Sequence, residues 1–140
     1  MRTLDSIKIL SLLCFISIDI NSEFTTNTLT INSSSIEVKK NYDEIIFNGN
    51  VLIKSKDFII NADNAIYNNI KKIVSVNGAP SRINSTYEDN IFIGSADKIV
   101  FSETNEIKLI GNAQMKYENI DITSNEISFS LQDGKITTNN

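Results

Sequence analysis

Two aspartates in similar surroundings are the first residues of this sequence that could do chemistry. Asp63 lies in "INADNAIYNN" and Asp97 in "GSADKIVFSE", and each follows an alanine and precedes alternating apolar and aromatic positions. A carboxylate pair could act as general acid and base or ligate a hard metal ion. With no histidine and only Cys14 as a thiol, the usual triads and zinc sites are excluded.

The spacing of weak repeats argues against an acidic site. Ala62 and Ser124 follow Gly49 and Gly111 at equal distances, and counting back from Gly49 gives a further copy at Ser33. The positions equivalent to the two aspartates are therefore Ser34 and Asn125. Serine and asparagine can bond a local backbone group as aspartate does, but they cannot replace it as acid or metal ligand. We interpret the motif as a bend and predict no catalytic residue, no metal site, no cofactor and no enzymatic activity.

Alternation of apolar and polar residues from Thr28 onward predicts short β-strands in four weak repeats. Around Ala62 the apolar face shifts by one residue, from Phe58 and Ile60 to Ala65 and Tyr67. Side chains on a strand alternate strictly, so such a shift requires a bulge or a corner. The sequence thus predicts an all-β domain whose strand segments meet at four equivalent bends.

The N-terminal region differs from the rest. Residues 1–22 contain a polar start and the apolar run "ILSLLCFISI", which is too short to span a bilayer as a helix. We interpret residues 1–22 as an export signal cleaved after Ser22, which leaves residues 23–140 as one domain without a thiol, as suits an oxidising compartment. The net charge of −4 argues against a nucleic-acid partner.

The inward face predicted from alternation is long enough to form a core or, with the strands splayed, an apolar groove that takes acyl chains. Periodicity alone leaves both possibilities open. Besides the residues named below as lipid-binding, this face contains Ile45, Val51, Tyr67, Val74, Val76, Ile99, Ile107, Met115, Ile120, Ile127 and Leu131.

The ordered set "LTINSSSIEV", "IIFNGNVLI", "INADNAIY", "VNGAPSRI", "GSADKIVF" and "LIGNAQM" resembles the OstA-like domain of the LptA family of lipopolysaccharide-transport proteins, over residues 28–136. The resemblance implies a V-shaped β-jelly roll of about 12–16 short antiparallel strands, located in the periplasm. It also implies a passive bridge that carries lipopolysaccharide by its lipid A acyl chains in an apolar interior. The implied partners are LptC-like and LptD-like proteins and further copies of the chain, stacked by edge strands.

By this resemblance, Leu29 and Ile31 fall in a first-strand segment that contacts lipid, and Ile83 falls on another such position, although the repeat spacing would turn Arg82 inward instead. The expected lipid-binding residues are Leu29, Ile31, Ile36, Val38, Phe47, Ile53, Phe58, Ile60, Ile83, Phe92, Phe101, Leu109, Ile122 and Phe129.

Open backbone edges are expected near residues 28–32 and 127–131, where neighbouring copies or partner domains would add strands. The C-terminal segment "DGKITTNN" leaves little sequence for a final strand, and this argues against end-to-end stacking at the C-terminal edge. Two alternatives remain at this point: an LptC-like protein that keeps its N-terminal segment as a membrane tether, and a structural β-repeat protein with a packed core and no lipid.

Overall fold

The computed structural model describes residues 6–19, 28–87, 90–102 and 104–140. These form nine strands and one short 3-10 helix, η1 (Lys40–Tyr42). The strands are β1 (Ser6–Asp19), β2 (Thr28–Lys39), β3 (Glu44–Lys54), β4 (Phe58–Asn68), β5 (Ile73–Tyr87), β6 (Asn90–Ser102), β7 (Glu106–Tyr117), β8 (Ile120–Ser130) and β9 (Ile136–Asn139).

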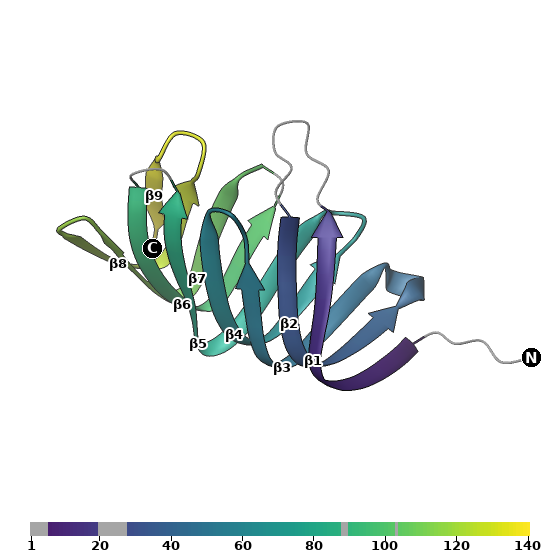
Figure 1. The fold of residues 1–140 in the computed structure, drawn as a ribbon. Coiled ribbons are helices and arrows are strands. Elements are labelled where there is room, and N and C mark those ends of the chain that lie inside the picture. Colours follow the sequence, from purple (N-terminus) through teal and green to yellow (C-terminus); the bar gives the residue numbers. More distant parts are fainter. Residues whose placement is uncertain (1–5, 20–27, 88–89, 103) are drawn as a thin grey trace, which may run out of the picture.

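All nine strands belong to one sheet in which every strand pairs antiparallel with its neighbours in the chain. Figure 1 shows them side by side in chain order, the long strands strongly curved, so that the sheet forms a V-shaped trough. The all-β V-shaped fold is as predicted. The strand count in the described residues is lower than 12–16, because two predicted segments join into one long strand that bends in its middle.

The bend occurs at the same place in each long strand, and we call this line across the sheet the crease. The pairing register shifts between Asn32 and Ser35, between Asn61 and Asn64, and between Ser95 and Lys98, and it shifts at matching points of the other long strands. Small residues dominate its inner side, since the two halves of the sheet approach closely there. These inner residues are Ser33, Val51, Ala62, Ser81, Ala96, Ala113 and Ser124.

Gly-Asn pairs supply the extra residue that makes the register shift. Gly49 and Asn50 have φ of 79° and 48°, and Gly111 and Asn112 have φ of 81° and 47°. Glycine and asparagine are the residues that adopt this left-handed conformation most readily. In β5 the corresponding segment, around Gly78, carries a cis Ala79–Pro80 bond and two extra residues relative to its neighbours.

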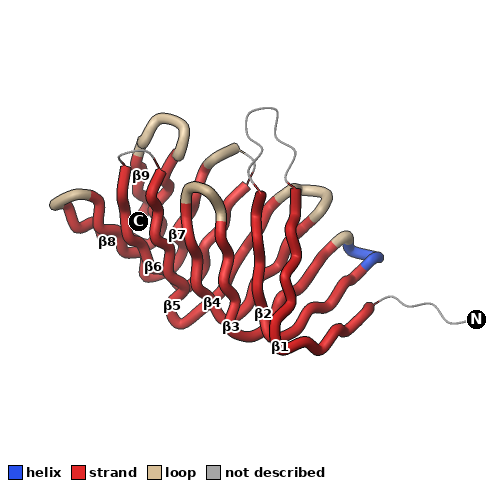
Figure 2. Tube along the Cα trace, viewed as in Figure 1, coloured by secondary structure: helices blue, strands red, loops and turns tan. Residues whose placement is uncertain are grey.

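The crease divides the sheet into two arms whose inner faces pack against each other. The first arm consists of residues 28–32, 51–54, 58–61, 82–87, 90–95, 113–117 and 120–124, and the second of residues 35–39, 44–48, 64–68, 73–77, 98–102, 106–110 and 126–130. The turns lie at the strand ends, along the two rims of the trough (Figure 2). Aliphatic and aromatic residues from both arms form one buried cluster between them.

The structure corrects one prediction about the inward face, at Ile120, and decides between two alternatives at Arg82 and Ile83. Ile120, predicted to face inward, is 57% exposed, because it begins β8 directly after the β7–β8 turn, at the rim. Ile83 is buried and Arg82 exposed, so the structure agrees with the family resemblance and not with the repeat spacing. Between the inward positions on the two sides of the crease, β5 spans five residues (Val76 to Ser81) where β3 spans four (Phe47 to Val51), and this difference of one residue changes the parity.

Both sheet edges that were predicted to be open are covered, at least in part. Thr28–Asn32 pairs with Phe15–Asp19 of β1, and Ile127–Phe129 pairs with β9, a final strand that the sequence was not expected to supply. β1 consists of residues that we interpreted as an export signal, and the cleavage site after Ser22 lies outside the described residues. In the described part of the chain no helix is long and apolar enough to cross a membrane.

Candidate functional site

The interior of the trough brings all fourteen expected lipid-binding residues together. Twelve of them lie in the buried cluster, while Val38 and Ile122 are partly buried and pack against it. They come from every strand between β2 and β8, because alternation on each strand turns the same face inward on either side of the crease. The result is one continuous apolar face.

Aromatic contacts join the two arms across the interior. The ring of Phe58 in the first arm meets that of Phe101 in the second at a centroid distance of 5.1 Å, and Phe92 meets Phe129 at 4.4 Å. Tyr117 of the first arm lies 6.4 Å from Phe129. Aromatic pairs at such distances stabilise beyond the area that they bury. The interior is therefore filled by its own side chains, and a guest molecule must separate the two arms or displace these rings.

Four of the five buried polar residues in the described structure are serines, Ser33, Ser81, Ser85 and Ser124, and the fifth is Asp57; alternation of apolar residues does not predict them. Ser33 donates to the carbonyl of Ser35 at 3.0 Å, and Ser85 donates to that of Asp57 at 3.1 Å. The hydroxyl of Ser81 is fully buried and has no hydrogen-bond partner in the described structure. Ser81 lies opposite Ala96 in the row of small residues at the crease, and the sequence alone carries no signal of this pairing.

The structure assigns the two aspartates to the crease. Asp97 accepts a hydrogen bond of 2.9 Å from the side-chain amide of Asn112, one of the left-handed residues of β7. A Cβ added to Gly111 would lie 2.8 Å from Asp97 Oδ2, and one added to Gly49 would lie 2.9 Å from the hydroxyl of Ser34. Ser34 and Asp97 thus occupy equivalent places against a glycine, as the repeat predicts. Among the described residues no group of three metal-ligating side chains is present.

Replacing Asp63 by asparagine is expected to change the free energy of unfolding by no more than about 0.5 kcal/mol, because its side chain is exposed and asparagine keeps the local hydrogen-bonding capacity. Asp97→Asn should behave in the same way. Chemical denaturation of both variants, followed by circular dichroism, measures this. Loss of lipid binding by Asp63→Asn with the fold intact would restore the acidic-site hypothesis.

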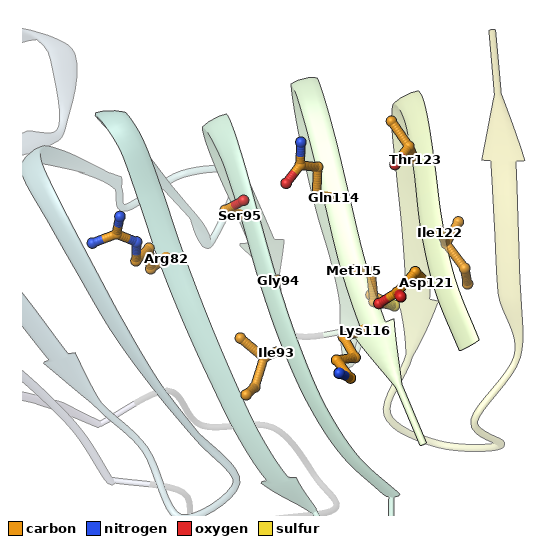
Figure 3. Close-up of a pocket in the computed structure, with 10 residues that line it drawn as sticks. All are labelled: Arg82, Ile93, Gly94, Ser95, Gln114, Met115, Lys116, Asp121, Ile122 and Thr123. Carbon is orange, nitrogen blue, oxygen red and sulfur yellow. The ribbon is translucent and has the colours of Figure 1, made fainter. Parts of the chain in front are cut away.

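A hollow lies on the outer side of the first arm and has a volume of about 360 Å³. Figure 3 shows its lining of Ile93, Arg82, Lys116, Asp121 and six further residues from β5 to β8. Only Ile122 is shared with the expected lipid-binding residues. The lining combines charges of both signs with an exposed isoleucine, and it holds no nucleophile with an adjacent base.

Comparisons with known proteins agree with this architecture. Residues 30–135 match the family described as LptA/(LptD N-terminal domain) LPS transport protein. The fold is similar to the crystal structure of LptH, the LptA-homologous periplasmic component of the lipopolysaccharide transport device of Pseudomonas aeruginosa. That similarity has a TM-score of 0.73 at 14% sequence identity and covers 79% of this chain and 80% of LptH. No curated protein sequence matches the chain.

Proposed function

Since the chain belongs to the LptA/(LptD N-terminal domain) family of lipopolysaccharide transport proteins, which are not enzymes, we propose that it is a periplasmic bridge protein that binds the acyl chains of lipopolysaccharide in its interior. Copies of the chain would stack end to end by their edge strands and pass the lipid from an inner-membrane LptC-like partner to an outer-membrane LptD-like partner.

The observation that carries this proposal is the continuous apolar face formed by the fourteen residues in both arms. Each methylene group moved from water to such a surface gains about 0.8 kcal/mol, so a lipid with several acyl chains gains enough to compete with the contacts between the arms. The competing contacts include the pairs Phe58–Phe101 and Phe92–Phe129. Binding therefore consists of exchanging side-chain contacts across the trough for contacts with acyl chains.

The proposed export signal has a structural consequence. Residues 6–19 form β1 and cover the edge of β2 along both arms, in eleven residue pairs. Cleavage after Ser22 would remove β1 and leave the backbone groups of β2 free to pair with a partner. The mass of the protein isolated from the periplasm identifies its N-terminus, and a protein that retains Met1 would contradict this assignment.

Crosslinking from the interior tests lipid binding. With a diazirine amino acid of aliphatic size at Leu29 or Ile31, we expect an adduct with lipopolysaccharide after irradiation, because both side chains belong to the buried face. Charged substitutions are unsuitable here, since an unpaired carboxylate at Ile31 would unfold the protein.

The matched control carries the same probe at Ile93, which is 57% exposed on the outer side of the first arm. We expect no adduct from that position. Absence of an adduct from both Leu29 and Ile31 in a folded protein would contradict the proposed function and leave a structural β-repeat protein with a packed core. Equal yields of lipopolysaccharide adduct from Ile93 and from the interior positions would also contradict the proposed function.

A further inference from the structure

The edge of β8 is divided by the crease into a covered and an uncovered half. β9 pairs with Glu126–Phe129, in the second arm. Residues 120–124 pair with β7 on one side, Asn125 lies in the register shift, and the pairing with β9 does not reach any of these six residues on the other side. In the described structure these residues present a row of unpaired backbone groups, which is the usual template for adding a strand. Ile120, 57% exposed, lies within this row.

β9 is a weak cover for the other half. It has four residues, of which only Ile136 packs partly against the core, while the three that follow are exposed. Its end is held by the Ser124 hydroxyl, which lies 3.0 Å from the carbonyl oxygen of Asn139 and 2.7 Å from the side-chain oxygen of Asn140. Short elements with few buried apolar contacts open at a small fraction of the global unfolding free energy.

The β8–β9 turn is held by local hydrogen bonds and by one longer-range bond, in which Leu131 donates its N–H to the carbonyl of Asn105 at 2.8 Å. Gly134 donates its N–H to the carbonyl of Ser130 at 2.9 Å, and Lys135 donates its N–H to Asp133 Oδ1 at 3.1 Å. Hydrogen bonds from Ser130 and Lys135 hold the pKa of the exposed Asp133 carboxyl below its ordinary value. The buried side chain of Leu131 anchors the start of the turn, whereas none of these turn contacts is made by β9 itself.

A strand that pairs along the whole of β8 must bend where β8 bends. An ordinary straight strand would lose register at Ser124 and Asn125, whereas every long strand of this chain changes register at the crease. The partner that fits this edge is therefore a strand from a second copy of the chain. Once the proposed cleavage has removed β1 from its edge, β2, with twelve residues and its own bend at Ser33, is long enough to cover the eleven residues of β8.

We propose that β9 is a detachable cap on this interaction surface. A strand from a second copy pairs first with residues 120–125 and then displaces β9 from Glu126–Phe129, exchanging four residue pairs for a ladder along the whole strand. This inference rests on the proposed end-to-end assembly and adds to it a step that limits self-association.

A reversible lock tests the cap in the full chain exported to the periplasm. Ser128 and Thr137 are directly opposed, and opposed residues of an antiparallel pair are at a distance that a disulfide can span. The double variant Ser128→Cys/Thr137→Cys fastens β9 to β8 when oxidised. The proposed cleavage after Ser22 removes Cys14, and a Cys14→Ser background excludes this thiol from any uncleaved chain. Sedimentation equilibrium should show an association constant at least about tenfold below that of the reduced form and of the Cys14→Ser parent, since the incoming strand loses part of its ladder.

Two further variants should strengthen self-association instead of weakening it. Ser124→Ala removes the hydroxyl contacts with Asn139 and Asn140 and should raise the association constant by roughly fivefold, the equivalent of one hydrogen bond. A chain that ends at Lys135 lacks β9 and should associate more strongly still. The matched control Ser130→Cys/Thr137→Cys, whose residues are not opposed, should form no lock and should associate as the parent does.

The outcomes separate this proposal from the proposed function. If the parent associates and the oxidised lock associates equally well, the cap is wrong and end-to-end assembly stands. If neither the parent nor the chain ending at Lys135 associates, the proposed end-to-end assembly is wrong, and the proposal that β9 is a cap is then wrong as well. Association only after removal of β9 would support the cap.

Discussion

Replacing Phe129 by alanine is expected to lower the free energy of unfolding by about 3–5 kcal/mol. Phe129 is fully buried, and its ring contacts Phe92 of the opposite arm, with Tyr117 slightly further away. Removing the ring leaves a cavity where the two arms meet, and the backbone of β8, paired on both sides at this residue, cannot collapse to fill it.

Urea unfolding monitored by circular dichroism measures this loss. Ile93→Ala is the matched control, because this residue is apolar but 57% exposed, and its change should stay within about 0.5 kcal/mol. A loss below about 1 kcal/mol for Phe129→Ala would mean that the arms are not held together by this contact.

Replacing Gly111 by valine is expected to destabilise the protein by roughly 2–4 kcal/mol. Two costs combine. A β-branched residue is strained at a φ of 81°, and its Cβ would lie 2.8 Å from Asp97 Oδ2. Gly49→Val should have a similar effect, because Gly49 has a φ of 79° and an added Cβ would lie 2.9 Å from the hydroxyl oxygen of Ser34.

The two costs can be separated by the double variant Gly111→Val/Asp97→Ala, which removes the close contact and keeps the backbone strain. We expect it to recover part of the loss, measured in the same urea titration against Asp97→Ala alone. Full stability in Gly111→Val would contradict the assignment of Gly111 to a left-handed bulge.

Much of the fold and of the candidate site could be predicted, because the information is local. On β4 alone, Phe58 and Ile60 before the crease and Ala65 and Tyr67 after it show the alternation of apolar residues. They also show the shift of the apolar face by one residue at the crease. The same local pattern gives the buried positions of the candidate site, of which Phe47, Ile53 and Leu109 are examples. Lipid contact by these residues stays a prediction.

Other features depend on what neighbouring strands do. Arg82 and Ile83 exchange faces relative to the repeat spacing because β5 has one residue more at the crease than β3 and β7, the glycine-containing copies that set this spacing. Ser81 is buried without a partner because it stands opposite Ala96, a relation that exists only once the strands have paired. Ile120 is exposed because of its place at the rim.

The sequence by itself determined a bent, repeated β-domain with one apolar face, and it showed that Asp63 and Asp97 belong to the bend. Only the tertiary structure decided that the two arms close on each other, through contacts such as Phe92–Phe129, and that β1 and β9 cover the sheet edges. The reason is physical: alternation is set residue by residue along a strand, whereas face-to-face packing and edge pairing join residues far apart in the chain. Such pairing depends on which backbone groups and which apolar surfaces the rest of the sheet leaves unsatisfied.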